Sequence, residues 1–406
     1  MKTQTSRQFF ALMLVVILAL GWNYWLPTAE NFYNLVTKAN ANRARDLQNV
    51  DFYAYYNAGA RFSNGENPYY WGEQFSDYLY PPTLLPMYSL LARLPYNQAR
   101  LFWLAMYFIV YLIAMTSLAL TLQRELRLVF WILVVLLTLV SFPLLNHIHN
   151  GQADVFIAGF SMGGLAAYAR GRRWLAAFLF ALGTVMKVSP LLFLIFFVIY
   201  LRDWRFLVEF LVNCLGLCLL SLIFIPAGLY PDYILNILPE ISKGTDYWIN
   251  QSLLKYLYGN AIVAQLVAVM GIIGFMVLTW VIRQRSRLQE SRLVAPLDRG
   301  AMTVVTIFLM NLLVILVFAG KAWSMAYAWT ILPAALYLTL LLQLEPRPIY
   351  LYLNIAGIFL ISAKVYGYPL LDSLNLWGSL LLLGLCGTGL LFRRQAFRHV
   401  PWLDVK

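Results

Sequence analysis

The carboxylate of Asp51 stands out among the groups that could do chemistry, because it opens the aromatic run DFYAYYN in an otherwise apolar chain. Ionisable groups held close to a bilayer usually mark a site, and an apolar wall raises the pKa of a carboxyl toward values useful for removing a proton. The sequence therefore predicts a general base at Asp51. The alternative is an N-cap, in which the carboxylate accepts a bond from the backbone of a short helix. Asp154 is the second candidate for the base.

Lys187 is the second informative charge, because it lies between two short apolar segments, 174–187 and 188–201. A lone lysine in apolar surroundings must reach the membrane surface or meet an anion. A phosphate is a natural partner, since an ammonium group binds it as a point charge. The remaining possibility is a carboxylate such as Asp154. Lys321, beside Trp323, is a weaker candidate of the same kind, because it lies near a predicted helix end.

His147 and His149 flank Ile148 and account for two of the three histidines in the chain. A metal needs more ligands than this segment offers, so we expect hydrogen bonds to a substrate phosphate or hydroxyl. The alternative is that this helix end bonds to its own loop. We recognise no nucleotide, zinc or catalytic-triad motif, and we expect neither a metal nor another cofactor.

The elements that position these residues are membrane spans. The chain has 406 residues, of which 61% are hydrophobic and only 12% are charged, whereas soluble domains carry about 25% charged residues. The sequence predicts a single all-α, polytopic membrane domain over residues 1–406. The net charge of +12 is typical of basic cytoplasmic loops, so we expect the lipid bilayer as a partner and no nucleic acid.

Apolar runs predict about 12 transmembrane helices. The segment 80–94 covers only about 22 Å as a helix, which is less than a hydrocarbon core, and we expect it to lie at the interface. A long first outer loop, 28–99, therefore carries interfacial helices, and a second outer loop spans 227–260. The predicted spans are 9–27, 100–122, 128–146, 152–169, 174–187, 188–201, 205–226, 261–282, 301–319, 325–344, 349–365 and 375–392.

The distribution of arginine predicts the orientation. With the N-terminus in the cytoplasm, the basic clusters within 170–173, 283–292 and 393–398 all fall inside, as the positive-inside rule requires. Both termini are then cytoplasmic. Asp51, the histidine pair and Lys187 fall on the outer side. We expect a multi-pass protein of the cytoplasmic membrane whose site faces the periplasm or exterior.

Tyrosine and tryptophan are frequent in the predicted outer segments, and Tyr55 and Tyr56 lie next to Asp51. Most of these residues are expected to form an aromatic belt at the lipid–water boundary. Some are expected to stack on sugar rings.

Six short motifs occur in order on the predicted outer side. Together they resemble the polyprenyl-phosphate-mannose-dependent mannosyltransferases of glycosyltransferase family 87, over about residues 9–345. The motifs are Asp51-Phe52-x-x-Tyr55-Tyr56, Asn67-Pro68-Tyr69, Tyr80-Pro81-Pro82-Thr83, Asn150-Gly151-Gln152, Met186-Lys187-x-x-Pro190 and Asn250-Gln251-Ser252-Leu253.

The resemblance implies a GT-C-type helical bundle and an inverting transfer of mannose. The donor would be a polyprenyl-phosphate sugar, and the acceptor a glycolipid or glycan at the outer membrane face. Asp51 corresponds to the family's base. The resemblance and the outer placement together give three groups of expected residues: the base Asp51; the donor-phosphate ligands Lys187, His147, His149 and Lys321; and the substrate ligands Tyr55, Tyr56, Gln152, Asp154, Asn250, Gln251, Ser252 and Tyr327.

One departure from the family pattern concerns the stretch Trp323-Ser324-Met325-Ala326-Tyr327, where many relatives carry a histidine. Tyr327 is one substitute, and the pair His147 and His149 is another. Two other functions remain as alternatives. One is a transporter or flippase of lipid-linked sugars, which often shows internal repeats; the other is a polymerase or ligase of the O-antigen type. The oligomeric state is not predicted.

Overall fold

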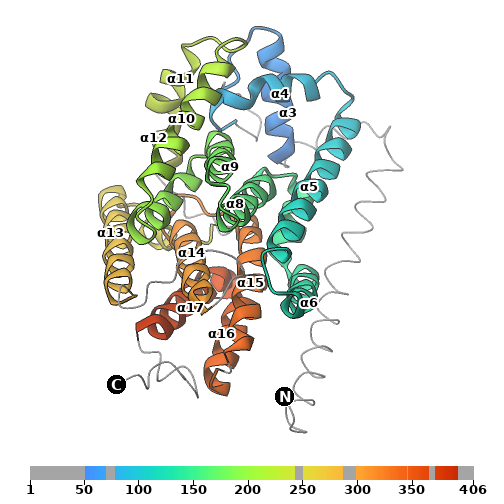
Figure 1. Cartoon of the computed structure of the whole chain (residues 1–406). Helices are drawn as coiled ribbons and strands as arrows, with labels where there is room; N and C mark the ends of the chain where they lie inside the picture. The colour runs from blue at the N-terminus through green and yellow to red at the C-terminus, as the bar shows by residue number, and fades with distance from the viewer. Residues whose placement is uncertain are drawn as a thin grey trace.

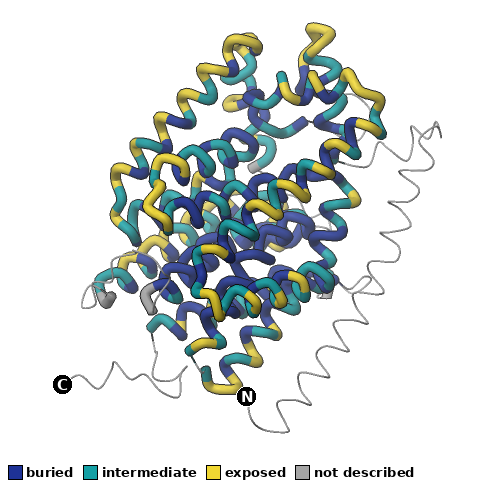
Figure 2. Tube along the Cα trace, turned by 45° about the vertical axis from the view of Figure 1, so that its right-hand side comes forward, coloured by how far each residue is buried: buried dark blue, intermediate teal, exposed yellow. Residues whose placement is uncertain are grey.

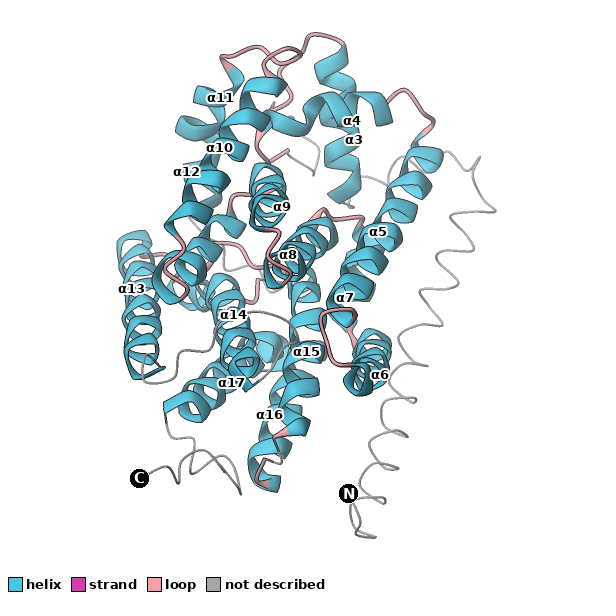
Figure 3. Cartoon of the chain, viewed as in Figure 1, coloured by secondary structure: helices cyan, strands magenta, loops and turns pink. Residues whose placement is uncertain are grey.

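The computed structural model describes residues 51–69, 78–242, 250–286, 299–344, 346–364 and 371–391. These residues form helices joined by loops (Figure 3), and no strand occurs among them apart from one isolated bridge between Asn250 and Trp323. The all-α prediction is confirmed. The first half contains α3 (Asp51–Ser63), η1 (Pro82–Leu84), α4 (Leu85–Leu91), α5 (Tyr96–Ala119), α6 (Arg124–Val140), α7 (Phe142–Asn150), α8 (Asp154–Ala169), α9 (Arg173–Met186), η2 (Ser189–Phe193) and η3 (Ile195–Tyr200).

The second half begins with α10, which is followed by a run of short helices before the long α13. Its elements are α10 (Trp204–Ser221), α11 (Leu229–Asp232), η4 (Tyr233–Ile237), α12 (Leu238–Ser242), η5 (Leu253–Leu257), α13 (Ala261–Ser286), α14 (Arg299–Phe318), η6 (Ser324–Thr330), α15 (Ile331–Gln343), α16 (Pro348–Ser362), η7 (Leu371–Ser373) and α17 (Leu374–Leu391).

Six of these helices are long and apolar enough to cross a membrane: α5, α10, α13, α14, α17 and the continuous pair η6–α15. The bent pair α6–α7 makes a seventh if it is one span, and α8, α9, η2–η3 and α16 are shorter apolar helices. The polytopic helical prediction is therefore confirmed. The predicted span 9–27 lies outside the described residues. Segment 80–94 forms only the short η1 and α4, as its length led us to expect.

The predicted span 128–146 is not a single helix. The chain bends by 67° between α6 and α7. Ser141 has an extended backbone and its hydroxyl accepts a bond from the Leu144 amide at 3.2 Å, while Pro143 occupies the first turn of α7. A serine cap followed by proline starts a new helix, so the apolar run is divided in two.

The centre of the molecule is formed by α8, α14 and α15, whose residues are mostly buried (Figure 2). Small residues let α8 approach its neighbours. A Cβ on Gly159 would lie 2.5 Å from a methyl carbon of Val110 in α5, and one on Gly164 would lie 2.8 Å from the ring of Phe180 in α9. These close approaches fix α8 against α5 and α9.

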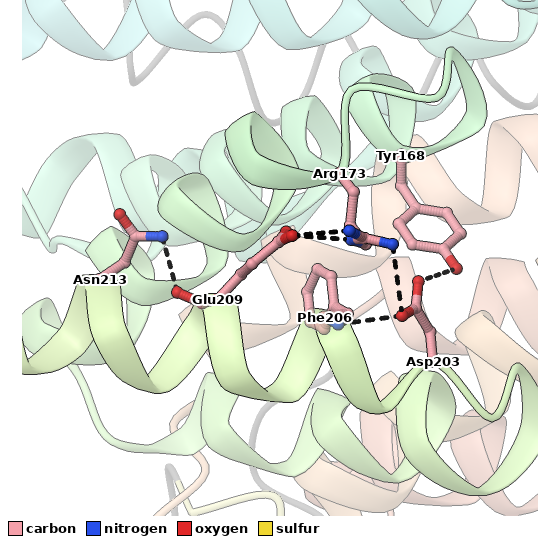
Figure 4. A network of polar contacts seen from close by, with 6 residues as sticks. All are labelled: Tyr168, Arg173, Asp203, Phe206, Glu209 and Asn213. Carbon is pink, nitrogen blue, oxygen red and sulfur yellow. Dashed lines mark hydrogen bonds and ion pairs between the residues drawn. The ribbon is translucent and has the colours of Figure 1, made fainter.

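A polar network joins α8, α9 and α10 at one end (Figure 4). The guanidinium of Arg173 donates to Glu209 at 2.8 Å and lies 3.9 Å from Asp203. Asp203 accepts from the Tyr168 hydroxyl at 2.8 Å and from the Phe206 amide at 2.9 Å, which caps α10. These contacts fix the basic turn between α8 and α9 to the start of α10.

The opposite end of α8 and α9 faces the short helices α3 and α4. Figure 1 shows α3, α4 and α11 gathered at one end of the molecule and α16 and α17 at the other. The tyrosines here are mainly core residues rather than a boundary belt. Tyr55 stacks on Tyr88 with ring centroids 5.2 Å apart, and Tyr78 packs edge-on against Tyr88 at 5.9 Å. The belt prediction is wrong for these buried residues, because their rings pack against one another inside the protein and do not face lipid.

Candidate active site

Asp51 occupies the first turn of α3 and contacts the start of α8. Its Oδ2 accepts a hydrogen bond from Nε2 of Gln152 at 2.7 Å, across 101 residues of sequence. The side chain of Asp51 is half-buried, whereas Gln152 is only 1% exposed. Among the bonds of the described residues, none joins this carboxylate to the backbone of α3. The contact therefore differs from the N-cap alternative.

Gln152 is placed by the turn between α7 and α8. Gly151 has a left-handed backbone with φ +67° and ends α7, and its amide donates to the His147 carbonyl at 2.9 Å. A Cβ on Gly151 would lie 2.7 Å from the Cβ of Phe52. Both the conformation and the close approach of α3 therefore require glycine. Because Phe52 follows Asp51, the same contact fixes the Asp51 carboxylate beside Gln152.

Helix α5 holds the turn from its other side. Nε1 of Trp103 donates to the Gly151 carbonyl at 2.8 Å, and Nη2 of Arg100 donates to the His149 carbonyl at 2.5 Å. Carbonyls at a helix end have no partner within the helix, and here α5 supplies one for each. Sequence reasoning missed Arg100 and Trp103. Arg100 is 9% exposed, and a charge at the start of an apolar span was the signal that could have found it.

The first turn of α8 is held by α3 and α7. The Ala153 amide donates to the Tyr55 hydroxyl at 3.2 Å, and the Val155 amide donates to Nε2 of His147 at 3.3 Å. Tyr55 and His147 are fully buried. Free amides at a helix start need acceptors, and these two side chains provide them. Both side chains therefore bond to the first turn of α8.

Lys187 meets Asp154 at the first turn of α8. Its Nζ lies 2.7 Å from Oδ1 of Asp154, and it also lies over the Trp329 ring, 5.8 Å from the centroid. The Asp154 side chain is 2% exposed, whereas that of Lys187 is 27% exposed. Lys187 follows the last residue of α9 with an extended backbone. An ammonium group has three donors, so this ion pair leaves N–H groups available to a further anion.

The electrostatic environment favours proton uptake by Asp51. Burial raises the pKa of this carboxyl to about 6. The bond from Gln152 lowers the pKa, the charge of Asp154 raises it, and the charge of Lys187 lowers it again. A carboxylate with this pKa is largely ionised at neutral pH and is a stronger base than an exposed aspartate.

A second polar segment, 250–252, packs against the loop that precedes η6. Oδ1 of Asn250 accepts from the Ala322 amide at 3.0 Å, and the Gln251 amide donates to the Ala322 carbonyl at 2.7 Å. The Tyr327 hydroxyl donates to the Gln251 carbonyl at 2.8 Å. All the named side chains of this segment and Tyr327 are fully buried, so they shape the loop from inside.

The two polar regions are connected through η6. Nδ2 of Asn146 in α7 lies 3.2 Å from the Ser324 hydroxyl, and Lys187 lies over Trp329. The segment 250–252 thus bonds to residues just before and within η6, while α7 and Lys187 contact the same helix. One helix, η6, supports both sets of predicted residues.

The profile of glycosyltransferase family 87 matches residues 78–310. This range covers more than half of the chain. The chain belongs to glycosyltransferase family 87. No curated protein matches the chain.

Family membership and an all-helical, multi-span structure identify a membrane glycosyltransferase. The matched range contains Gln152, Asp154, Lys187 and the segment 250–252, while Asp51 precedes it. Membership favours the enzyme over the transporter alternative, which would not form a glycosidic bond.

Within this glycosyltransferase, the structure brings some predicted residues together and separates others. Asp51, Gln152, Asp154 and Lys187 form one group, whereas Asn250, Gln251, Ser252 and Tyr327 belong to the second segment. Tyr55 is buried and Tyr56 donates to the Leu94 carbonyl at 2.8 Å, so both have structural bonds. His149 is exposed and Lys321 is half-buried.

Proposed function

We propose that this family 87 glycosyltransferase moves mannose from a polyprenyl-phosphate donor to a hydroxyl of a glycolipid or glycan acceptor, with inversion. The observation that carries the proposal is the half-buried Asp51 carboxylate, whose pKa is raised to about 6 and whose second oxygen has no described partner. A single carboxylate suffices for a one-step displacement. The acceptor supplies the only proton that must be removed.

The reaction is one substitution at the anomeric carbon. The acceptor oxygen forms the new bond to this carbon while the bond from the carbon to the phosphate oxygen breaks. The hydroxyl proton passes to Asp51 and the electron pair leaves with polyprenyl phosphate. A lipid monophosphate carries less charge than a nucleotide diphosphate, and a lysine can offset it. Lys187 is our candidate, because its ammonium group is held by Asp154 and remains partly exposed.

The proposal places this reaction at the outer face of the cytoplasmic membrane, with both termini inside. Arg170, Arg172 and Arg173 lie at the turn that joins the end of α8 to the start of α9, whereas Asp51 contacts Gln152 just before the start of α8. Cysteine substitutions at Gly65 and Glu290 should be labelled from opposite sides of sealed cells or vesicles. Labelling of both from one side would contradict this orientation.

The activity can be tested with the full chain in nanodiscs. Polyprenyl-phosphate mannose bearing a labelled sugar is incubated with membrane glycolipids as acceptors, and the product is separated from the donor. We expect labelled glycolipid and one equivalent of polyprenyl phosphate. Transfer from polyprenyl-phosphate glucose, and none from polyprenyl-phosphate mannose, would assign glucose as the transferred sugar. A polymerase of the O-antigen type would instead extend a lipid-diphosphate oligosaccharide.

A further inference from the structure

Gln152 makes a contact that neither packing nor helix formation explains. It lies between α7 and α8, is 1% exposed, and directs Nε2 at Asp51. Its Oε1 is buried without a hydrogen-bond partner among the described residues. A buried amide with one end unpaired is costly, because that end has lost its water. An apolar side chain at this position would avoid the cost of the unpaired Oε1. We therefore look for the role of Gln152 in the bond from its Nε2 to Asp51.

The orientation of the amide follows from chemistry. An ionised carboxylate only accepts hydrogen bonds, so the NH₂ end of Gln152 must face it. The bond occupies Oδ2 of Asp51 and leaves Oδ1 without a described protein partner. Gly151, Trp103 and Tyr55 hold the backbone on both sides of Gln152. The amide is therefore fixed before any substrate binds.

We propose that Gln152 is the positioning residue of the base: it fixes the Asp51 carboxylate and favours its ionised form, so that Oδ1 takes the acceptor proton. This inference rests on the proposed function, because Gln152 can position a base only if Asp51 is that base. It replaces the direct substrate contact that the sequence led us to expect for Gln152.

The other titratable groups around Asp51 do not mask its response to pH. Burial raises the pKa of Tyr55 and Tyr80 well above the ordinary value for a tyrosine, so both phenols stay neutral. Asp154 and Lys187 face Asp51 as an ion pair. The groups that face the carboxylate are Tyr55 from α3, Tyr80 from the loop before η1, Gln152 and Asp154 from the start of α8, Tyr107 from α5 and Lys187 from the end of α9.

The test compares Gln152→Ala and Gln152→Asn with the unchanged enzyme over pH 5–9. Loss of the bond raises the pKa of Asp51, so the acidic limb of kcat/KM should move upward by about one pH unit in Gln152→Ala. We expect kcat at pH 7 to fall about tenfold with the donor KM changed less than twofold. Gln152→Asn, which keeps a shorter amide, should recover part of the activity. Ser161→Ala, a buried polar position further along α8, is the matched control.

An acidic limb that stays in place, with activity reduced equally at every pH, would show that Gln152 is only structural and would overturn the inference. The proposed function has a separate test. If Asp51→Asn is inactive and still binds donor while Gln152→Ala keeps its pH profile, the base stands and only the inference fails. If Asp51→Asn is active, the base itself is wrong.

A second feature, independent of sugar transfer, is an apolar groove of about 490 Å³ between η3, the start of α10 and α13. Its lining combines aliphatic side chains with two tryptophans, Trp204 at 62% exposure and Trp280 at 50%. Arg202 also lines the groove and has a left-handed backbone, φ +57°. The remaining lining residues are Val198, Ile199, Met276 and Val277.

Arg202 has no carboxylate partner among the described residues. With the Gln284 amide oriented to accept, its oxygen lies 3.2 Å from Nη2 of Arg202 and 3.0 Å from Nε1 of Trp280. A lining that combines aliphatic side chains with a guanidinium and two indoles is complementary to a lipid that carries an acyl chain and a phosphate. We infer that this groove binds an anionic phospholipid of the bilayer. Arg202 of the groove precedes Asp203 of the polar network, which lies at the start of both α9 and α10. This part of the protein is distant from the contact between Asp51 and the start of α8.

Native mass spectrometry of the full chain, released from nanodiscs that contain phosphatidylglycerol and phosphatidylcholine in equal amounts, tests the site. We expect a retained phosphatidylglycerol that Arg202→Gln reduces about tenfold. Arg172→Gln, an exposed arginine of the neighbouring turn, should have no effect. Equal retention of both lipids, or equal loss in the two variants, would overturn the inference and indicate ordinary annular lipid.

Discussion

The Nζ of Lys187 lies 2.7 Å from Oδ1 of Asp154, so two charges separated by 33 residues meet at the first turn of α8. Each charge is placed by a helix end: Asp154 begins α8, and Lys187 follows α9. Because the charges of Asp154 and Lys187 shift the pKa of Asp51 in opposite directions, the pair keeps a nearly neutral environment beside the proposed base. The arrangement supports both the fold and the proposed chemistry.

Replacing Lys187 by methionine should destabilise the protein by about 3 kcal/mol, because the Asp154 carboxylate stays buried without its partner. Thermal unfolding in detergent measures the loss. The double variant Lys187→Met with Asp154→Asn should recover much of it. Glu66→Gln, which breaks the exposed pair of Arg61 and Glu66 at 3.5 Å, is the control and should change stability by about 1 kcal/mol or less. Equal losses in the two single variants would contradict the prediction.

The double variant Lys187→Gln with Asp154→Asn separates donor binding from stability, because it removes both charges together. We expect the donor KM to rise about tenfold while the acceptor KM stays within twofold, since the phosphate loses a charged hydrogen-bond donor. Steady-state kinetics with each substrate varied in turn provides the measurement. An unchanged donor KM would exclude Lys187 from the phosphate site.

Gly151→Ala should abolish most activity, because its φ of +67° is strained for alanine and its Cβ would approach that of Phe52 to 2.7 Å. Gly65→Ala is the matched control. Gly65 has a similar φ of +75° but no atom within 4 Å of the new Cβ. Turnover and unfolding temperature are measured for both. If the two variants lose equal activity, the close contact between α3 and the turn does not position the base.

Much of the fold follows from the sequence, because span length and composition are local properties. The apolar runs predicted α5, α10, α13, α14 and α17 with small boundary differences. The break at Ser141 was missed, although the Ser-Phe-Pro sequence at residues 141–143 contains a helix cap and a proline. A run of high hydropathy hides such a bend unless the caps are examined.

The site was predicted only in part, because sequence gives residue types and not the distances between them. Asp51, Gln152, Asp154 and Lys187 were all candidates, but their pairing depends on how α3 packs on the turn between α7 and α8. Tyr327 is a further example. It was predicted as a substrate ligand, and the structure adds that its hydroxyl donates to the Gln251 carbonyl inside the core, a contact that the residue type alone does not indicate.

The pH dependence of kcat/KM should follow the ionisation of Asp51 in the free enzyme. Since the base must be ionised, activity is present above the pKa of about 6 and is lost as the pH falls through that value. Initial rates from pH 4.5 to 8, with stability checked at each pH, provide the test. A flat profile between pH 5 and 7.5 would contradict the raised pKa.

The most direct measurement is turnover by Asp51→Asn, with donor binding and unfolding temperature measured on the same preparation. A general base contributes about 10²–10⁴-fold to rate, so we expect turnover to fall by at least about 100-fold while donor binding and the unfolding temperature stay close to those of the unchanged enzyme. Asparagine caps a helix as well as aspartate does, so a purely structural carboxylate would leave the rate nearly intact. Near-normal turnover in Asp51→Asn would contradict the account and return the base to Asp154.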